Sequence, residues 1–280
     1  MGVNPSAMPM LYRVYKEVQG GHMYEDINQV DLAFVMDTTG SMGPLIKAAR
    51  ERMIEMLRRV AAAADIHLQL GIVEYRDHEP QAKMLTSVYP FTTDLEQAQQ
   101  VLMSLSADEG GDAPEAVLDG ILAACHKLSW RRHAVRLLVL VGDAPPHGVG
   151  AGGDFFAGGC PCGETIASVT RQAEETSLTI HALGLTSSVD ESFSEISALT
   201  GGQFFAAGQA DKAIVHIEEL LQKQFAELEL DRQVLAQYRA QPELDSETLA
   251  QHLDVSRHVA ANALVRLLSR DLIEVPVRQA

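Results

Sequence analysis

The chain has 280 residues, of which 46% are hydrophobic, and its formal net charge at pH 7 is −16. Its length suffices for one sizeable α/β domain and a small appendage, and the acidic balance disfavours binding to nucleic acid or anionic membranes. Three cysteines cannot build a disulfide framework. We recognise no membrane span and no secretion signal, and we therefore expect a cytoplasmic protein without a membrane partner.

Residues 1–29 are predicted to form an N-terminal arm, either a tag or a native segment. From residue 30 to residue 228, strand and helix patterns alternate. Apolar runs predict strands at 31–37, 67–75, 135–141, 178–185 and 203–206. Helical periodicity predicts helices at 44–60, 95–105, 114–128, 164–176, 190–199 and 210–228. This alternation is typical of a doubly wound, mostly parallel sheet with helices on both faces.

Residues 229–280 have a wholly helical pattern until Ile273 and predict a separate small module. A short helix from Ser246, a tight turn and a second helix capped by Ser256 form a predicted helix-turn-helix. We expect Val259 to face inward on the second helix. The segment that starts at Leu272 predicts a short strand, which would make the module similar to a winged helix.

Side chains that carry oxygen gather where predicted strands end. Because open α/β sheets bind ligands beyond the carboxyl ends of their strands, loops far apart in the chain can converge there. Hard oxygen ligands suit Mg²⁺, with Mn²⁺ or Ca²⁺ as alternatives. The alternative is a purely structural role, in which these side chains only cap helices. The predicted metal ligands are Asp37, Thr39, Ser41, Asp112 and Asp143.

The order of these motifs resembles the von Willebrand factor A family over residues 30–228. Its metal-ion-dependent adhesion site has Asp-x-Ser/Thr-x-Ser in the first loop, which residues 37–41 match, and an aspartate in the third loop, which Asp143 matches. The resemblance implies a doubly wound fold, bound Mg²⁺ and binding of protein partners. The family usually has threonine in the second loop, where this chain has Asp112. Three carboxylates leave one net negative charge on a site with Mg²⁺, which predicts tighter metal binding and weaker recruitment of an acidic ligand.

A long glycine-rich loop, residues 144–163, follows Asp143, and long loops at a ligand-binding edge are often functional. We expect it to border the metal site and to help select partners. The predicted rim of the site consists of Gly110, Gly111, Glu115 and His147.

The loop also contains Cys160 and Cys162. Zinc sites usually combine four ligands, often as two cysteine pairs, so a lone Cys-x-Cys segment is interpreted as a loop turn. A metal or redox role is the alternative. His78 and Glu79, which follow the predicted strand 67–75, are interpreted as polar loop residues.

Together these features predict a non-enzymatic adaptor that binds one protein at the metal edge and uses the C-terminal module for a second partner or for dimerisation. The resemblance suggests a bacterial protein that works beside an AAA+ ATPase or a product of the same operon. Two alternatives remain open. One is a DNA-binding regulator, although residues 229–280 contain six arginines, no lysine and eight acidic residues. Its candidate DNA or partner contacts are Arg257, His258, Asn262 and Arg266.

The second alternative is a metal-dependent phosphohydrolase. Residues 37–41 also resemble the phospho-aspartate loop of haloacid-dehalogenase-type phosphatases, in which the aspartate is the nucleophile. Most soluble members need a second acid two residues later, where this chain has Thr39.

Overall fold

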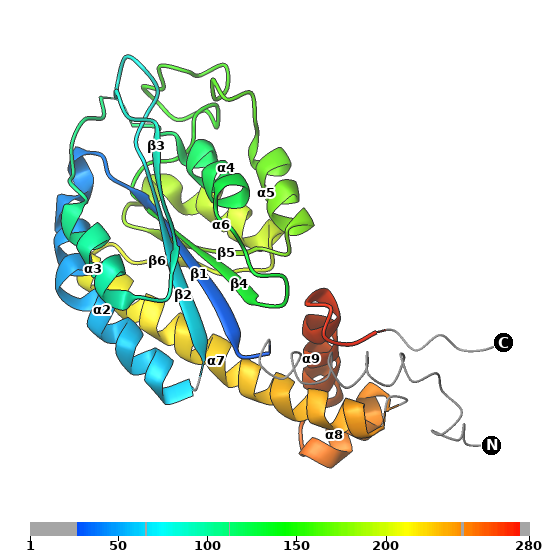
Figure 1. Ribbon diagram of the computed structural model, residues 1–280. Coiled ribbons are helices and arrows are strands. Elements are labelled where there is room, and N and C mark those ends of the chain that lie inside the picture. The colour runs from blue at the N-terminus through cyan, green and yellow to red at the C-terminus, as the bar shows by residue number, and fades with distance from the viewer. Residues whose placement is uncertain (1–26, 65, 112, 242–243, 275–280) are drawn as a thin grey trace, which may run out of the picture. The chain divides into compact units, whose positions relative to one another are not determined.

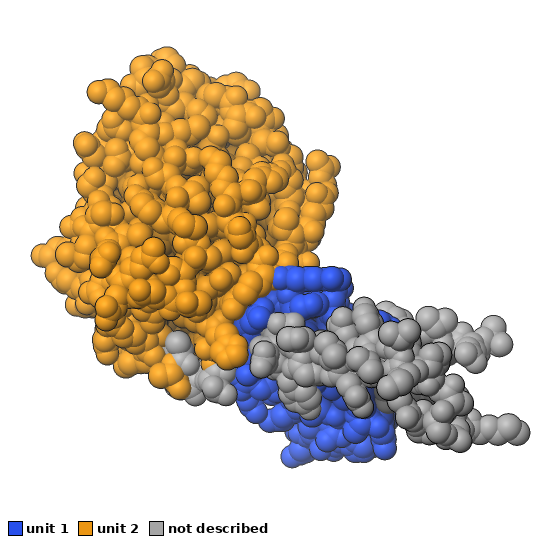
Figure 2. Space-filling model, in the orientation of Figure 1, with its two compact units in different colours: residues 1–29, 132–134, 226–280 blue, residues 30–131, 135–225 orange. Residues whose placement is uncertain are grey.

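The computed structural model describes residues 27–64, 66–111, 113–241 and 244–274. The chain divides into two compact units, coloured separately in Figure 2. The larger unit comprises residues 30–131 and 135–225, and the smaller one comprises residues 1–29, 132–134 and 226–280. Most of the predicted N-terminal arm lies outside the described residues. Among the helices of the described part, none is both long enough and apolar enough to cross a membrane.

The larger unit is built on a six-stranded sheet with the order β3-β2-β1-β4-β5-β6 (Figure 1). The strands β1, β4, β5 and β6 pair in parallel, and β2 and β3 pair antiparallel. Because β1 has β2 and β4 as neighbours, the strand order reverses beside β1, where doubly wound folds bind ligands. The strands are β1 (Gln29–Asp37), β2 (His67–Tyr75), β3 (Thr86–Thr92), β4 (Val135–Gly142), β5 (Thr179–Gly184) and β6 (Phe204–Ala206).

Helices cover both faces of this sheet (Figure 1). On one face lie α2 (Gly43–Ala64), α3 (Leu95–Ser104) and the first part of α7 (Ala210–Ala240). On the other lie α4 (Val117–Lys127), α5 (Ile166–Glu175) and α6 (Asp190–Leu199). Two short 3-10 helices, η2 (Gly40–Met42) and η3 (Ser187–Val189), follow β1 and β5. The predicted α/β fold with a mostly parallel sheet is confirmed.

The central strands are buried along their whole length, which explains their continuous apolar sequence. In β1 every residue from Val30 to Asp37 is buried. Ala33 and Val35 of this strand belong to the core shared with α4, α5 and α6. This packing brings a fully buried aspartate, Asp37, to the end of the strand.

Strand β3 was not predicted from the sequence. Its residues read TSVYPFT and are half-buried except for Pro90, which is exposed. Proline cannot donate to a ladder, but an edge strand tolerates it. Since Pro90 and the surrounding polar residues interrupt the apolar pattern, β3 is visible only through its pairing with β2.

The smaller unit contains the end of α7, α8 (Ser246–Leu253) and α9 (Arg257–Ser269). The predicted helix 210–228 is too short, because α7 continues to Ala240. Ser256 caps α9 as predicted, its hydroxyl accepting a hydrogen bond from the Val259 amide at 3.3 Å. Val259 itself is 38% exposed and does not face inward. Within residues 270–274, the described part of the chain's end, there is no strand to form the predicted wing.

Candidate functional site

The most unusual polar group of the larger unit is Asp37, which is completely buried at the end of β1. Its Oδ1 accepts hydrogen bonds from the Thr39 amide at 2.8 Å and the Thr39 hydroxyl at 2.7 Å. Its Oδ2 is also buried, and it has no hydrogen-bond partner among the described residues. A buried carboxylate oxygen without a partner is costly unless a cation or a donor binds there.

The ends of β1 and β2 are joined beside this carboxylate. The Thr38 amide donates to the Tyr75 carbonyl at 3.0 Å. The Tyr75 hydroxyl is buried without a hydrogen-bond partner among the described residues. Burial, followed by the charges of Asp37, Glu115 and Asp143, raises the pKa of Tyr75 well above its usual value. Tyr75 is therefore a neutral neighbour of a group of carboxylates.

The loop before α4 packs onto the loop after β1. The Gly40 amide donates to the Glu109 carbonyl at 3.1 Å, and the Asp108 amide donates to the Thr38 carbonyl at 3.1 Å. Gly110 has a φ of 86°, and a Cβ there would lie 3.1 Å from the Thr39 Cβ. This close approach needs glycine. The predicted ligand Asp112 belongs to the same loop but lies outside the described residues.

The third loop begins at Asp143, directly after β4, and this residue is half-buried. Its carbonyl accepts hydrogen bonds from the hydroxyls of Thr186 at 2.5 Å and Ser188 at 3.0 Å. Burial raises the pKa of Asp37, the hydrogen bonds from Thr39 lower it and the nearby Asp143 raises it, and together these effects bring it to about 7. Asp37 and Asp143 thus lie close enough for their negative charges to repel each other.

These donors fit a hard divalent cation. Asp37, Thr39 and Asp143 offer only oxygen atoms, the donor type that Mg²⁺ requires. Ser41 is exposed in η2, two residues beyond Thr39, where its hydroxyl can complete the set. The predicted ligands of the described part therefore lie beyond the carboxyl ends of the central strands β1 and β4.

Two of the four predicted rim residues are buried and therefore cannot contact a partner. Glu115 is 3% exposed and its amide donates to the Pro145 carbonyl at 3.0 Å. The His147 side chain is fully buried. Gly111 is exposed and Gly110 half-buried, so only the glycines are open to a partner.

His147 is drawn inward because a carboxylate faces each of its ring nitrogens. Nε2 lies 2.7 Å from the Asp77 Oδ1, and Nδ1 lies 2.8 Å from the Asp154 Oδ1. Burial lowers the pKa of His147, but its interactions with Asp77 and Asp154 together outweigh this, and the pKa is raised. The His147 ring joins the segment after β2 to the glycine-rich loop, whose Gly148 and Phe156 amides also bind Asp154 at 2.8 Å.

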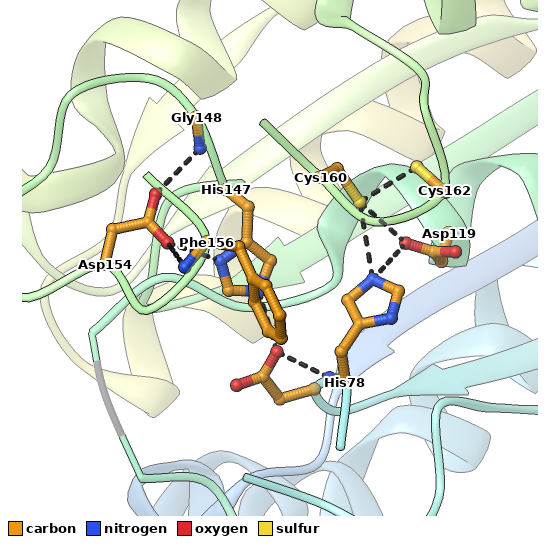
Figure 3. A network of polar contacts seen from close by, with 9 residues as sticks. His78, Asp119, His147, Gly148, Asp154, Phe156, Cys160 and Cys162 are labelled. Atoms are coloured by element: carbon orange, nitrogen blue, oxygen red, sulfur yellow. Dashed lines mark hydrogen bonds and ion pairs between the residues drawn. The ribbon is translucent and has the colours of Figure 1, made fainter. Parts of the chain in front are cut away.

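A second polar cluster was missed by the sequence analysis. His78, Asp119 and Cys160 come from the segment after β2, from the first turn of α4 and from the glycine-rich loop (Figure 3). The His78 Nε2 lies 3.1 Å from the Asp119 Oδ2 and 3.4 Å from the Cys160 Sγ. The Cys160 Sγ lies 3.2 Å from the same carboxylate oxygen and 2.8 Å from the Cys162 Sγ. The only local signal was the Cys-x-Cys segment, because the other residues are far away in sequence.

A cavity of about 350 Å³ opens beside this cluster. Its lining includes His78, Phe156 and Pro161. The Phe156 ring meets the His78 ring edge to face, with the ring centroids 5.6 Å apart. The cavity therefore gives access to the histidine from the side of the glycine-rich loop.

The predicted contact residues of α9 differ in accessibility. Arg257, His258 and Asn262 are exposed. Arg266 instead forms an ion pair with the buried Asp231, with the Arg266 Nη2 2.6 Å from the Asp231 Oδ1. Arg266 therefore stabilises the helical module, and its predicted contact with DNA or a partner stays a prediction.

Part of the chain is similar in sequence to known proteins. Residues 31–147 match the family model of the von Willebrand factor A domain. The alpha-protein kinase vwkA of Dictyostelium discoideum is 27% identical over 137 residues, which are 48% of this chain and 22% of the kinase. The chain thus spans about a fifth of the length of this curated relative.

Two solved structures share the fold. Proximal thread matrix protein 1 from the mussel byssus has a TM-score of 0.51 and 14% identity, over 72% of this chain and 47% of that chain. Another structure of this mussel protein has a zinc-occupied metal-ion-dependent adhesion site. The pilus adhesin SpaC from Lactobacillus rhamnosus GG has a TM-score of 0.50 and 15% identity, over 72% and 30% of the two chains. At such identities, these likenesses concern the fold alone.

Proposed function

Since residues 31–147 match the family model of the von Willebrand factor A domain, a type of module that mediates protein interactions, we propose that this chain is a non-enzymatic adaptor. Its metal edge binds a protein partner, and the C-terminal module binds a second partner or dimerises. The observation that carries the proposal is the buried Asp37 Oδ2, which has no hydrogen-bond partner in the described part of the chain although Asp143 lies nearby.

The residues that would hold Mg²⁺ are Asp37, Thr39, Ser41, Asp112 and Asp143. Thr39 fixes the orientation of Asp37, because its amide and hydroxyl both donate to the same carboxylate oxygen. Tyr75 and the packed strand ends exclude water beneath the site. A bound divalent cation supplies an open coordination position that an acidic side chain of the partner can occupy.

The partner is proposed to be another protein, such as an AAA+ ATPase or an operon neighbour in the cytoplasm. A DNA-binding role receives less support, because the engagement of Arg266 with Asp231 removes one cation from the accessible face of α9. Only three of the four candidate contact residues are then exposed.

The test is affinity purification from cell extract with the full chain, with and without a chelator. The Asp37→Ala variant and the chelator should each abolish capture of the same partner. Glu55→Ala, a change of an exposed acidic residue on α2, is the matched control and should retain it. A partner that Asp37→Ala still captures, or that survives the chelator, would overturn the proposal.

A further inference from the structure

The second polar cluster brings together four side chains that bind metals in other proteins. They come from three separate segments and point toward one another (Figure 3). A nitrogen of His78, an oxygen of Asp119 and the sulfur of Cys160 all lie within 4.8 Å of one another. The Cys162 sulfur extends the group at 2.8 Å from the Cys160 sulfur.

The distances are close to those of a tetrahedral zinc site. With Zn–N and Zn–O bonds of about 2.0 Å and Zn–S bonds of about 2.3 Å, the ligand atoms of such a site lie about 3.3–3.8 Å apart. The three separations among His78, Asp119 and Cys160 are 3.1, 3.2 and 3.4 Å. Cys162 is not among the residues whose ligand atoms all lie within 4.8 Å of one another, so its side chain has to turn away from the Cys160 sulfur and toward the other ligands for all four groups to bind one ion.

The two cysteines are free thiols, and their 2.8 Å separation is far above the length of a disulfide bond, about 2.05 Å. Cys160 is buried in the same hydrophobic core as Cys125, and the partly buried Cys162 packs against this core. Unlike Cys125, however, Cys160 directs its sulfur at a histidine and a carboxylate. A cation would satisfy all three groups together.

We propose that His78, Asp119, Cys160 and Cys162 form a structural zinc site. Two sulfur ligands, one imidazole and one carboxylate suit Zn²⁺ and disfavour Mg²⁺, which prefers oxygen ligands only. Four protein ligands leave no open position, so the site stabilises structure and does not activate water. On binding, Zn²⁺ replaces the two thiol protons, which pass to the solvent.

The site fixes the glycine-rich loop at its C-terminal end. His147 and Asp154 join the loop near its start, and Cys160 and Cys162 join it to α4 and to His78. His78 is itself held by its amide, which donates to the Asp77 Oδ1 at 2.6 Å. Because Asp77 also binds His147, one buried carboxylate supports both attachments. This inference does not depend on the proposed adaptor function.

The experiment measures metal content and coordination in the full chain, purified under reducing conditions. We expect about one zinc ion per chain that survives dialysis, a stoichiometry expected for one closed structural site. Replacing zinc with Co²⁺ should give a near-ultraviolet thiolate-to-cobalt charge-transfer band. The Cys160→Ser/Cys162→Ser variant should lose both the zinc and this band, and Cys125→Ser should keep both.

A second variant separates this site from the oxygen cluster, which could also take zinc. Asp37→Ala should retain the charge-transfer band, because Asp37 is not one of the proposed ligands. His78→Gln tests the site without touching a cysteine and should weaken zinc retention at least about tenfold. Circular dichroism checks that each variant is folded. Zinc retained in full by the double cysteine variant, a cobalt complex without a thiolate band, or zinc lost only in Asp37→Ala would each overturn the proposal.

Discussion

Two clusters at the same end of the sheet differ in their donor atoms. The cluster around Asp37 and Asp143 offers only oxygen, whereas the cluster around His78 and Cys160 combines nitrogen, sulfur and one carboxylate. The first is assembled from strand ends and the second mainly from a helix and a loop. The donor atoms therefore favour different cations, because oxygen ligands suit Mg²⁺ and a set with nitrogen and sulfur suits Zn²⁺.

The largest effect is expected from the charge of Asp112, which distinguishes the oxygen cluster. One unit charge about 4 Å from the metal at an effective dielectric constant near 20 is worth up to about 4 kcal/mol. Asp112→Thr should weaken Mg²⁺ binding at least about tenfold in calorimetry and leave the zinc content unchanged. An unchanged Mg²⁺ affinity would contradict the predicted role of the third carboxylate.

The buried ion pairs of His147 come next in size. Replacing one partner of a buried charge pair typically costs about 3 kcal/mol, because the remaining charge is left uncompensated. His147→Gln should lower the free energy of unfolding by roughly this amount in urea denaturation and speed proteolysis of the glycine-rich loop. Asp154→Asn, which leaves the Asp77 interaction in place, should cost less. Equal losses in both variants would count against an ion pair with Asp77.

One pH effect should come from His181, which lies in β5 of the sheet. Burial, together with the charge of Lys223, lowers the pKa of His181 to about 4. The unfolded chain then binds more protons between about pH 6.5 and pH 4, so stability falls as the pH falls through this window, by up to about 3 kcal/mol. His181→Gln should remove this part of the pH dependence of chemical denaturation. The same slope in both proteins would show that another group is responsible.

The smallest of these effects is expected from Gly120→Ala, which should affect both clusters. A Cβ at Gly120 would lie 2.7 Å from the Tyr75 Cδ1 and 3.0 Å from the Val35 Cγ1. Gly120→Ala should therefore cost about 1–2 kcal/mol, since overpacking outweighs the better helix propensity. It should also reduce the affinity for both cations, because Tyr75 borders the oxygen cluster and Asp119 adjoins Gly120. Gly152→Ala, where nothing lies within 4 Å, is the control and should leave the melting temperature unchanged.

Much of the fold could be predicted because the buried strands are continuous apolar runs. The strands β1 and β4 end at Asp37 and Gly142, so their carboxyl ends could be located from sequence. Strand β3 could not, because an edge strand with Pro90 lacks such a run. The length of α7 was underestimated, because its polar residues gave no clear place to end the helix.

The two clusters differ in the same way. Asp37, Thr39 and Ser41 form a compact motif, and the position of Asp143 after a strand adds a second local signal. His78 and Cys160, by contrast, are 82 positions apart and only tertiary packing brings them together. The burial of His147 could not be predicted either, since nothing in the sequence around it indicates that two carboxylates enclose its ring.

The attachment of the glycine-rich loop on both sides of its tip has a practical consequence. His147 and Asp154 close residues 148–153 into a small hoop, in which an added Cβ at Gly152 would meet nothing within 4 Å. A sequence inserted at Gly152 would lie on the surface, while the interaction between His147 and Asp154 would still hold the two ends of the hoop together. The hoop is thus a place in the domain where natural variation, or a grafted peptide epitope, can be accommodated without altering the scaffold.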